Sequence, residues 1–207
     1  QKIDQIIGVK ANLIDALNKE FSANQIKVNI DAQTGAIVLD SNVMFEFDRF
    51  ELTPEGAVVL SKVLPIYCSV LLSDQYKDYL AEIIIDGYTD SDGSYLDNLK
   101  LSQNRAYAVA EYLVTSCGGF LNAEQQKMLE EKLTANGRSK SNLILDANGN
   151  EDAAASRRVE VKFRLKDDEM IQELSNIIAD AKVGETSPAG ETAPAGEIAP
   201  LQQEAVG

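Results

Sequence analysis

Histidine and tryptophan are both absent from the 207-residue sequence, and cysteine occurs only 2 times. Without histidine, the chain cannot build a Ser-His-Asp triad, a Cys-His pair or a histidine-ligated zinc site. Two cysteines alone give no metal-site spacing, so we expect neither a metal ion nor another cofactor. The lack of tryptophan removes a common sugar platform, and the clustered Asp86, Asp90 and Asp92 leave a carboxylate-based glycosidase only as an alternative.

Basic residues are also scarce. The chain has 19 Lys and Arg against 33 Asp and Glu, a formal net charge of -14 and a pI of about 4.4. Nucleic acid and anionic lipid are excluded as partners, because both require clustered basic residues. A neutral or zwitterionic ligand fits this charge better. No apolar run approaches the ~20 residues that span a bilayer. Since Gln1 is not a natural start, we expect a signal or membrane anchor to precede it.

Two interpretations remain for the cysteines. Cys68 falls in an apolar helical stretch, and Cys117 follows the end of a long helical pattern. A disulfide is compatible with an extracytoplasmic protein, but two buried free thiols are favoured.

Amphipathic periodicity predicts a helix over residues 1–21. Apolar residues recur there at steps of three and four: Ile3, Ile6, Ile7, Leu13, Ile14, Leu17 and Phe21. Such a helix either pairs with another chain or docks on its own domain. We favour pairing, as a linker and oligomerisation helix in a homodimer.

Alternation about Gly35 predicts a β-hairpin over residues 26–39, and a short strand is predicted over 43–47. Thr53 and Pro54 predict the N-cap and the first position of a helix. Pro65 predicts a kink in that helix or a stop near Leu64.

The second half of the chain alternates strands and helices. An Ile run at 83–85 predicts a buried strand, followed by a turn at 90–93 and a helix to 113. A helix is predicted over 122–133 with Asn136-Gly137 as its C-cap, then a loop over 139–155 and a strand over 157–165. Residues 167–182 predict a further amphipathic helix, and the Pro/Ala/Gly/Glu repeat of 184–207 predicts a disordered tail.

One motif carries most of the functional information. The strand at 83–88 leads into Thr89-Asp90, and Asn98, Leu101 and Arg105 follow at helical spacing. At about 100° per residue these three lie on one flank of the helix, near the turn that bears Asp90. A carboxylate and a guanidinium so placed can grip a zwitterion between them, or simply form an internal salt bridge.

This pattern resembles the signature of the OmpA/MotB-like peptidoglycan-binding family, a Gly-His-Thr-Asp element followed by Gly and Asn-x-x-Leu-Ser-x-x-Arg-Ala. VMFEFDRFELTPEGAVVLSKVLPIY is similar to the family's first strand and helix, and SRRVE, at 156–160, to its closing Asn-Arg-Arg-Val-Glu. The resemblance covers about residues 26–166 and is closest to MotB-like stator subunits, including those of Zorya defence systems. It implies an α+β fold: a two-layer βαβαβ sandwich with a mixed sheet, flanked by the helices at 1–21 and 167–182.

The resemblance also implies a ligand, the meso-diaminopimelate of a peptidoglycan stem peptide. Asp90 would accept its ammonium, Arg105 would bind its carboxylate, and Asn98 would hydrogen-bond the stem peptide. The pocket would be completed by Thr89, Leu101 and either Arg157 or Arg158.

Three departures from the family pattern bear on this pocket. Tyr88 stands where the family has His, Asp97 where an aromatic is common, and Ser156 where Asn is usual. The first and last alter hydrogen bonding, and Asp97 adds negative charge; none removes Asp90 or Arg105.

The implied function is non-catalytic. The domain would anchor a cell-envelope protein or an ion-driven stator to the cell wall, from an extracytoplasmic position and tethered to a membrane. Its partners would be peptidoglycan, a second copy and a membrane ion-channel subunit. The alternatives are an assembly module that does not bind the wall and a carboxylate-based peptidoglycan hydrolase.

Overall fold

The structure is a computed structural model that describes residues 2–166, with side chains from residue 8 onward. Within these residues a 4-stranded sheet has the order β1-β4-β2-β3, formed by β1 (Ile37–Asp40), β2 (Leu80–Tyr88), β3 (Leu133–Gly137) and β4 (Arg158–Leu165). Strand β4 is antiparallel to β1 and β2, whereas β2 and β3 are parallel. The mixed sheet predicted from the sequence is therefore confirmed. The helix predicted at 167–182 and the tail at 184–207 lie outside the described residues.

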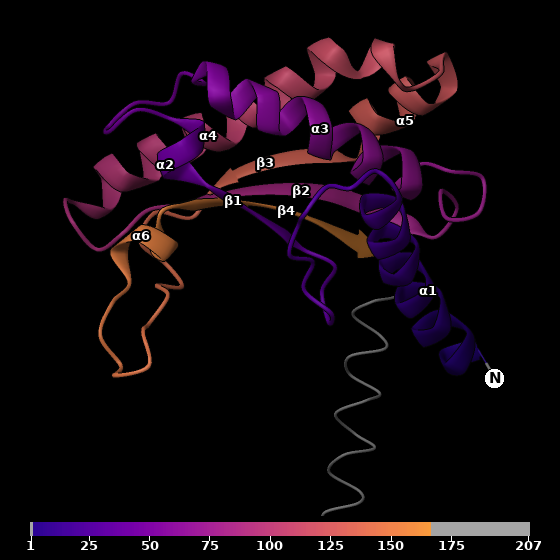
Figure 1. The fold of residues 1–207 in the computed structure, drawn as a ribbon, viewed down its shortest axis with the longest axis horizontal. Helices are drawn as coiled ribbons and strands as arrows, with labels where there is room; N and C mark the ends of the chain where they lie inside the picture. Colours follow the sequence, from indigo (N-terminus) through magenta and orange to yellow (C-terminus); the bar gives the residue numbers. More distant parts are fainter. Residues whose placement is uncertain (1, 167–207) are drawn as a thin grey trace, which may run out of the picture. The chain divides into compact units, whose positions relative to one another are not determined.

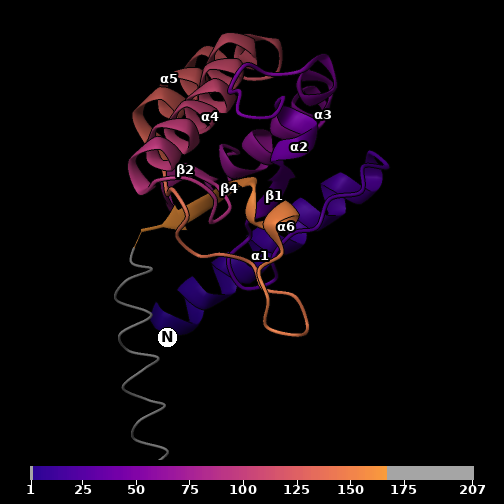
Figure 2. The ribbon, with the colours of Figure 1, turned by 90° about the vertical axis from the view of Figure 1, so that its left-hand side faces the viewer.

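The long helices α3, α4 and α5 lie over one face of the sheet, which gives the expected two layers (Figures 1 and 2). The helices are α1 (Lys2–Ala23), α2 (Ser41–Met44), α3 (Pro54–Leu71), α4 (Tyr95–Ser116), α5 (Ala123–Lys132) and α6 (Ala153–Ser156), with a 3-10 helix at Cys117–Gly119. Cys68 and Cys117 are both buried and unbonded, as favoured above, and burial raises the pKa of Cys68 to about 12.

The second half of α1 docks on its own domain, at the opposite end of the sheet from α2 and α6 (Figure 1). Leu13, Leu17 and Phe21 are buried in the common core, and the Tyr76 hydroxyl donates to the Asn12 carbonyl over 3.1 Å. These side chains were the basis for predicting a helix that pairs with another chain. The structure instead favours the intramolecular alternative for this half of the helix.

Only part of the predicted hairpin at 26–39 is present. Strand β1 begins at Ile37, and the opposite strand is reduced to the single bridge between Ile30 and Ile37. The Asp31 carboxylate accepts from the Gln33 and Thr34 backbone N–H groups, which replaces ladder pairing with a side-chain-capped turn.

The strand predicted over 43–47 is wrong. Helix α2 occupies Ser41–Met44, because the Asp40 side chain accepts from the Asn42 N–H as an N-cap. Only Phe45 retains strand character, as an isolated bridge to Leu52.

Helix α3 begins as predicted: the Thr53 side chain accepts from Gly56 N, and Pro54 lies in the first turn. The predicted stop near Leu64 is wrong, since α3 continues through Pro65 to Leu71. The carbonyl that Pro65 leaves without a helical donor belongs to the exposed Ser61, where water can bind it. Helix α3 also has the length and composition of a membrane span, but Leu64 and its buried neighbours place it in the core.

The predicted C-cap at Asn136-Gly137 is also wrong, because both residues lie in strand β3. Helix α5 ends at Lys132, and the next residues pair in parallel with β2, so that Gly137 faces Gly87. The Asn136 amide donates to the Asp86 carboxylate over 3.0 Å. A nonlocal strand partner has thus replaced a local cap.

Helix α4 touches the sheet backbone at these two glycines. A Cβ on Gly87 would lie 2.2 Å from the Ser102 carbonyl oxygen, and one on Gly137 would lie 2.7 Å from the Leu99 carbonyl oxygen. The Gln103 amide also donates to Ala135 O and accepts from Gly137 N, so it covers the outer edge of β3. Close approach, rather than turn conformation, explains why glycine occupies these positions.

The face of the sheet turned away from α3–α5 carries a buried charge. Asp86 is 0% exposed, and its Oδ2 lies 2.7 Å from Lys162 Nζ and 3.1 Å from Arg138 Nε. These are ion-pair contacts whose angles fall outside hydrogen-bond geometry, whereas Oδ1 accepts a directed hydrogen bond from Asn136. Burial alone would raise the pKa of Asp86, but the two cations and the Asn136 amide outweigh it and the pKa is lowered.

Replacing Gly87 with alanine should destabilise the protein by about 3 kcal/mol or more, because the new Cβ meets backbone that cannot move alone. Gly119→Ala is the matched control, since nothing lies within 4 Å of its added Cβ, and it should stay within about 0.5 kcal/mol of wild type. Urea unfolding measures both. Equal stabilities for the two variants would contradict the close-approach argument.

Asp86→Asn should lower stability at pH 7 by about 1–3 kcal/mol, because asparagine carries no charge to pair with Lys162 and Arg138. A carboxylate whose folded pKa is lowered stabilises the protein above its unfolded pKa of about 3.9 and loses that contribution as pH falls through the folded pKa. The difference from wild type should therefore shrink at pH 3. Urea unfolding at both pH values, with the exposed Asp78→Asn as control, tests this; an equal loss at both would indicate a steric effect.

Candidate functional site

Strand pairing gathers the predicted site residues at one end of the sheet. Thr89 and Asp90 follow the last residue of β2, and the antiparallel register pairs Tyr88 with Arg158. Arg157, one residue before β4, therefore lies beside Asp90. Helix α4 turns back from the same point and carries Arg105 over the end of the sheet. The site thus depends on the register of β2 with β4 and on the docking of α4.

A cavity of about 280 Å³ opens at this point, and we call it the Asp90 pocket. Six of the seven residues predicted from the sequence line it: Thr89, Asp90, Asn98, Leu101, Arg105 and Arg157. Its other lining residues were not predicted as site residues: Phe47, Asp48, Asp92, Gly93 and Asp97. The first two belong to the run VMFEFDRFELTPEGAVVLSKVLPIY, whose resemblance to the family's first strand and helix was the available signal for them.

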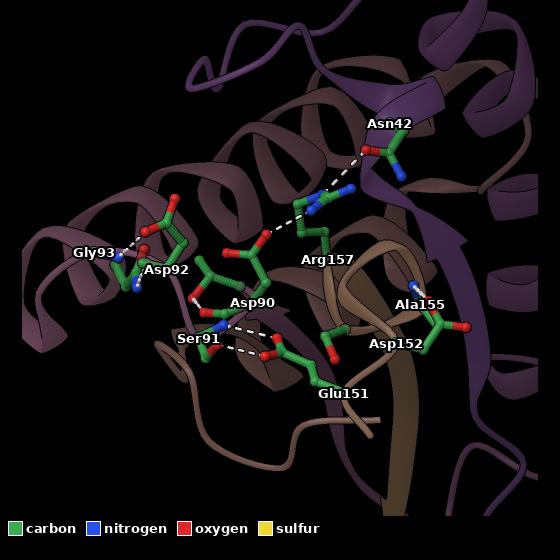
Figure 3. A network of polar contacts seen from close by, with 12 residues as sticks. Asn42, Asp90, Ser91, Asp92, Gly93, Glu151, Asp152, Ala155 and Arg157 are labelled. Carbon is green, nitrogen blue, oxygen red and sulfur yellow. Dashed lines mark hydrogen bonds and ion pairs between the residues drawn. The ribbon is translucent and has the colours of Figure 1, made fainter. Parts of the chain in front are cut away.

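Asp90 forms its ion pair with Arg157 and not with Arg105. Arg157 Nη1 lies 2.5 Å from Asp90 Oδ2, and Arg157 Nε donates to Asn42 Oδ1 over 3.2 Å (Figure 3). Within the described residues, Asp90 Oδ1 has no hydrogen-bond partner. The internal Asp90–Arg105 salt bridge considered above is therefore not the arrangement found. One carboxylate oxygen of this pocket-lining residue has no partner in the described part of the chain.

Arg105 is buried without a carboxylate partner in the described part of the chain. It is 4% exposed, its Nε donates to the Arg49 carbonyl over 2.8 Å, and its guanidinium lies 5.2 Å from the centroid of the Phe45 ring. Burial lowers the pKa of Arg105, opposed by the charge of Asp48 and assisted by that of Arg157, yet guanidinium remains protonated. Within the described residues, neither of its terminal nitrogens has a hydrogen-bond partner, and neither is sealed from solvent. They are donors available to a ligand.

The turn between β2 and α4 is held by side-chain hydrogen bonds. The Asn98 amide donates to the Asp92 carbonyl over 2.6 Å, and Gly93 adopts a φ of +82° that favours glycine. Ser94 caps α4 by accepting from Asp97 N, and the Asp97 carboxylate accepts from the Ser94 hydroxyl. Asn98 thus positions the turn, in addition to lining the pocket.

The same turn is also held by side chains of the long segment between β3 and β4. Glu151 accepts from both the backbone N–H and the hydroxyl of Ser91 (Figure 3). Lys140 Nζ donates to the Gly93 carbonyl over 3.0 Å. Sequence reasoning treated this segment only as a polar loop, because a contact over 60 residues leaves no local pattern.

Arg158 lies outside the pocket, although it was one of two candidates from the last strand. Its Nε pairs with Glu160 at 2.8 Å, its Nη1 donates to the Ser156 carbonyl, and its guanidinium stacks 4.0 Å from the Tyr88 ring centroid. Arg157 precedes β4 in extended backbone, and successive extended residues point in different directions. This explains why Arg157 reaches the pocket and Arg158 does not.

Comparison with known proteins places this arrangement in a family. A model of the OmpA family matches residues 44–165. The Zorya protein ZorB of Escherichia coli strain ATCC 8739 is 32% identical over 166 residues, which cover 75% of this chain and 68% of that protein. ZorB of Escherichia coli O139:H28 is 34% identical over 144 residues, covering 67% of this chain and 56% of that protein.

A solved structure shares the fold. The putative MotB like protein from Desulfovibrio vulgaris superposes with a TM-score of 0.56 at 19% identity, covering 80% of this chain and 97% of that one. This chain spans between about half and two thirds of the two ZorB proteins. None of these proteins is described as an enzyme. Because the family match includes β2, α4 and β4 and every predicted site residue, the chain belongs to the OmpA family and is related to the MotB-like ZorB proteins.

Proposed function

We propose that the Asp90 pocket binds the diaminopimelate of a peptidoglycan stem peptide and so anchors the protein to the cell wall. One observation carries this proposal: a buried guanidinium without a carboxylate partner, Arg105, shares a small pocket with a carboxylate oxygen of Asp90 that has no partner among the described residues. Diaminopimelate carries an ammonium and a carboxylate on one carbon, which matches this pair in charge and hydrogen-bonding capacity.

Each group of the ligand has a protein partner. Asp90 Oδ1 accepts from the ammonium, while Arg105 donates two hydrogen bonds from its terminal nitrogens to the carboxylate. Arg157 stands between the two and can contribute its remaining nitrogen to the carboxylate without leaving Asp90. Thr89 and Leu101 form the pocket wall, and Asn98 holds the turn that bears Asp90.

Negative charge around Asp90 and Arg105 favours binding of the ligand's ammonium group. Asp48, Asp92 and Asp97 line the pocket with Asp90, against the two cations Arg105 and Arg157. One oxygen of the Asp97 carboxylate already accepts a hydrogen bond from the Ser94 hydroxyl, which disperses part of its negative charge. The departure of Asp97 from the family pattern therefore weakens carboxylate binding less than its formal charge suggests.

The machine that this domain anchors is, we propose, an ion-driven stator of the Zorya type. Support comes from ZorB, which is 32% identical over 166 residues, and from the fold shared with a MotB like protein. The domain would act from the cell envelope, on the extracytoplasmic side, tethered by a membrane segment next to an ion-channel subunit. An assembly module that does not bind the wall would retain the fold, but it would not require a buried Arg105 without a carboxylate partner.

Arg105→Ala and Asp90→Ala should each weaken binding to diaminopimelate-type sacculi roughly ten- to hundredfold, since hydrogen bonds to charged groups contribute about 1.5–3 kcal/mol. Arg105→Lys should also bind poorly, because an ammonium cannot reproduce the two-point fork. Pelleting with purified sacculi measures binding, and melting curves report the folded fraction.

The controls for this experiment are Arg164→Ala and Asp74→Ala, which remove the same residue types from a partly exposed and an exposed position outside the pocket. Both should pellet like wild type. Normal pelleting by folded Arg105→Ala protein would contradict the proposed anchoring mechanism. Release of soluble fragments from sacculi by the wild-type protein would indicate the hydrolase alternative instead.

The homodimer remains a proposal. Because Leu13, Leu17 and Phe21 are occupied by their own domain, pairing through α1 would involve its first turns, before residue 8. Sedimentation should then show a dimer for residues 1–207 and a monomer for residues 8–207. Identical behaviour of the two forms would exclude pairing through this part of the helix.

A further inference from the structure

The ion pair between Asp90 and Arg157 uses only one carboxylate oxygen. Arginine and carboxylate frequently pair through two parallel hydrogen bonds, which would occupy both oxygens. Here Arg157 Nη1 lies 2.5 Å from Asp90 Oδ2, whereas Arg157 Nη2 and Asp90 Oδ1 have no partner among the described residues. The pair therefore lacks the second hydrogen bond of the usual fork. The oxygen left open is the one assigned above to the ligand's ammonium.

Asn42 holds the Arg157 guanidinium from the side opposite Asp90. Arg157 Nε donates to Asn42 Oδ1 over 3.2 Å (Figure 3). The Arg157 backbone is fixed as well, because its N–H donates to the Ala153 carbonyl over 3.2 Å and its carbonyl accepts from the Ser41 N–H over 3.1 Å. From this fixed backbone, the side chain can bind both Asp90 oxygens only by turning its guanidinium. That turn would break the contact with Asn42.

The orientation of the Asn42 amide is set by Asp40. The Asp40 Oδ1 atom accepts from the Asn42 backbone N–H and from the Asn42 NH₂ group, each over 2.8 Å. Because a carboxylate only accepts hydrogen bonds, the NH₂ group faces Asp40 and the amide oxygen faces Arg157. Helix α2 provides this geometry, since Asp40 is its N-cap and Asn42 lies in its first turn. The helix found in place of a predicted strand thus carries the residue that holds Arg157.

We propose that Asn42 is a positioning residue of the binding site. It restricts Arg157 to one oxygen of Asp90 and so keeps the other oxygen open for the ligand's ammonium. This inference rests on the proposed function, because it requires the ammonium to bind Asp90. Asn42 does not line the Asp90 pocket, so its effect on the ligand passes through Arg157.

Removal of the Asn42 side chain would free Arg157 Nε. The guanidinium can then turn so that Nη1 and Nη2 each donate to one oxygen of Asp90, the two-point arrangement that matches a carboxylate. Both oxygens are then occupied, and the ammonium has to displace an internal hydrogen bond before it binds. Ligand affinity falls although every residue that contacts the ligand is still present.

The same change should have little effect on the stability of the fold. Asn42 is exposed and Arg157 is partly exposed, so the hydrogen bond between them competes with water. The second contact between Asp90 and Arg157 offsets its loss. The N-cap of α2 also remains, because the Asn42 backbone N–H keeps its bond to Asp40. A positioning role therefore predicts lower affinity at unchanged stability, whereas a purely structural role predicts the reverse.

The test is calorimetric titration of the full chain with meso-diaminopimelate, together with thermal melting of each variant. Asn42→Ala should bind roughly tenfold more weakly than wild type, because the ligand loses one hydrogen bond between charged groups. It should melt within about 2 °C of wild type. Asn24→Ala is the matched control: this exposed asparagine lies just after α1, donates to the Glu20 carbonyl over 2.8 Å and lines no part of the Asp90 pocket. It should bind and melt like wild type.

A second pair of variants tests whether Asn42 acts through Arg157. Adding Asn42→Ala to Arg157→Ala should change the affinity by less than about twofold, because the residue through which Asn42 acts is already absent. A direct contact between Asn42 and the ligand would instead give the same loss with and without Arg157. That result would overturn the positioning role.

The remaining outcomes separate the inference from the function on which it rests. Wild-type affinity in Asn42→Ala would overturn the positioning role and leave the anchor intact. A lower melting temperature with full binding by the folded fraction would make Asn42 structural only and would also overturn the inference. Failure of the wild-type protein to bind either diaminopimelate or sacculi would overturn the proposed function itself, and this inference with it.

Discussion

The contact between α4 and the sheet backbone at Gly87 and Gly137 is the constraint on which the site depends. These glycines are paired across β2 and β3, and neither position has room for a Cβ. Ser102 and Gln103 of α4 rest on them, which fixes the height and the rotation of the helix over the sheet. Arg105, one turn further along α4, can reach the pocket at the end of β2 only because the helix lies this close.

This close packing also buries the Arg105 guanidinium, which costs free energy. A guanidinium 4% exposed and without a carboxylate partner in the described chain is costly, and the fold offsets that cost with the Arg49 carbonyl and the Phe45 ring. The acidic pocket supplies a favourable field without neutralising the group, because Asp90 is paired with Arg157. A zwitterionic ligand is therefore attracted to both ends of a site whose charges are not satisfied internally.

Contacts on both faces of β2 stabilise the strand and support the binding site at its end. Asp86 lies one residue before Gly87 and is held by Lys162 and Arg138 on the face away from α4. The strand is thus fixed by charge on one face and by helix contact on the other. Its next residues, through Asp90, enter the pocket from a rigid support, which is how a precise binding geometry is maintained.

Elements with strong local signals were predictable. The Thr53–Pro54 helix start and the β2–turn–α4 unit follow from capping residues and periodicity, and both are where expected. Elements that depend on distant partners were not. Residues 43–47 looked locally like a strand, and the Asn136-Gly137 pair like a cap. The Asp40 N-cap and the pairing of β3 with β2 decided otherwise.

The sequence by itself determined the chemistry of the site: an acidic chain without histidine, with Asp90 after the strand and Arg105 within the helix of one strand–turn–helix unit. Tertiary structure alone decided which charges meet. It paired Asp90 with Arg157 across 67 residues and turned Arg158 onto Tyr88. The reason is physical: helical and strand periods fix the direction of a side chain relative to its neighbours in sequence, but ion pairs form between atoms brought together by register and packing.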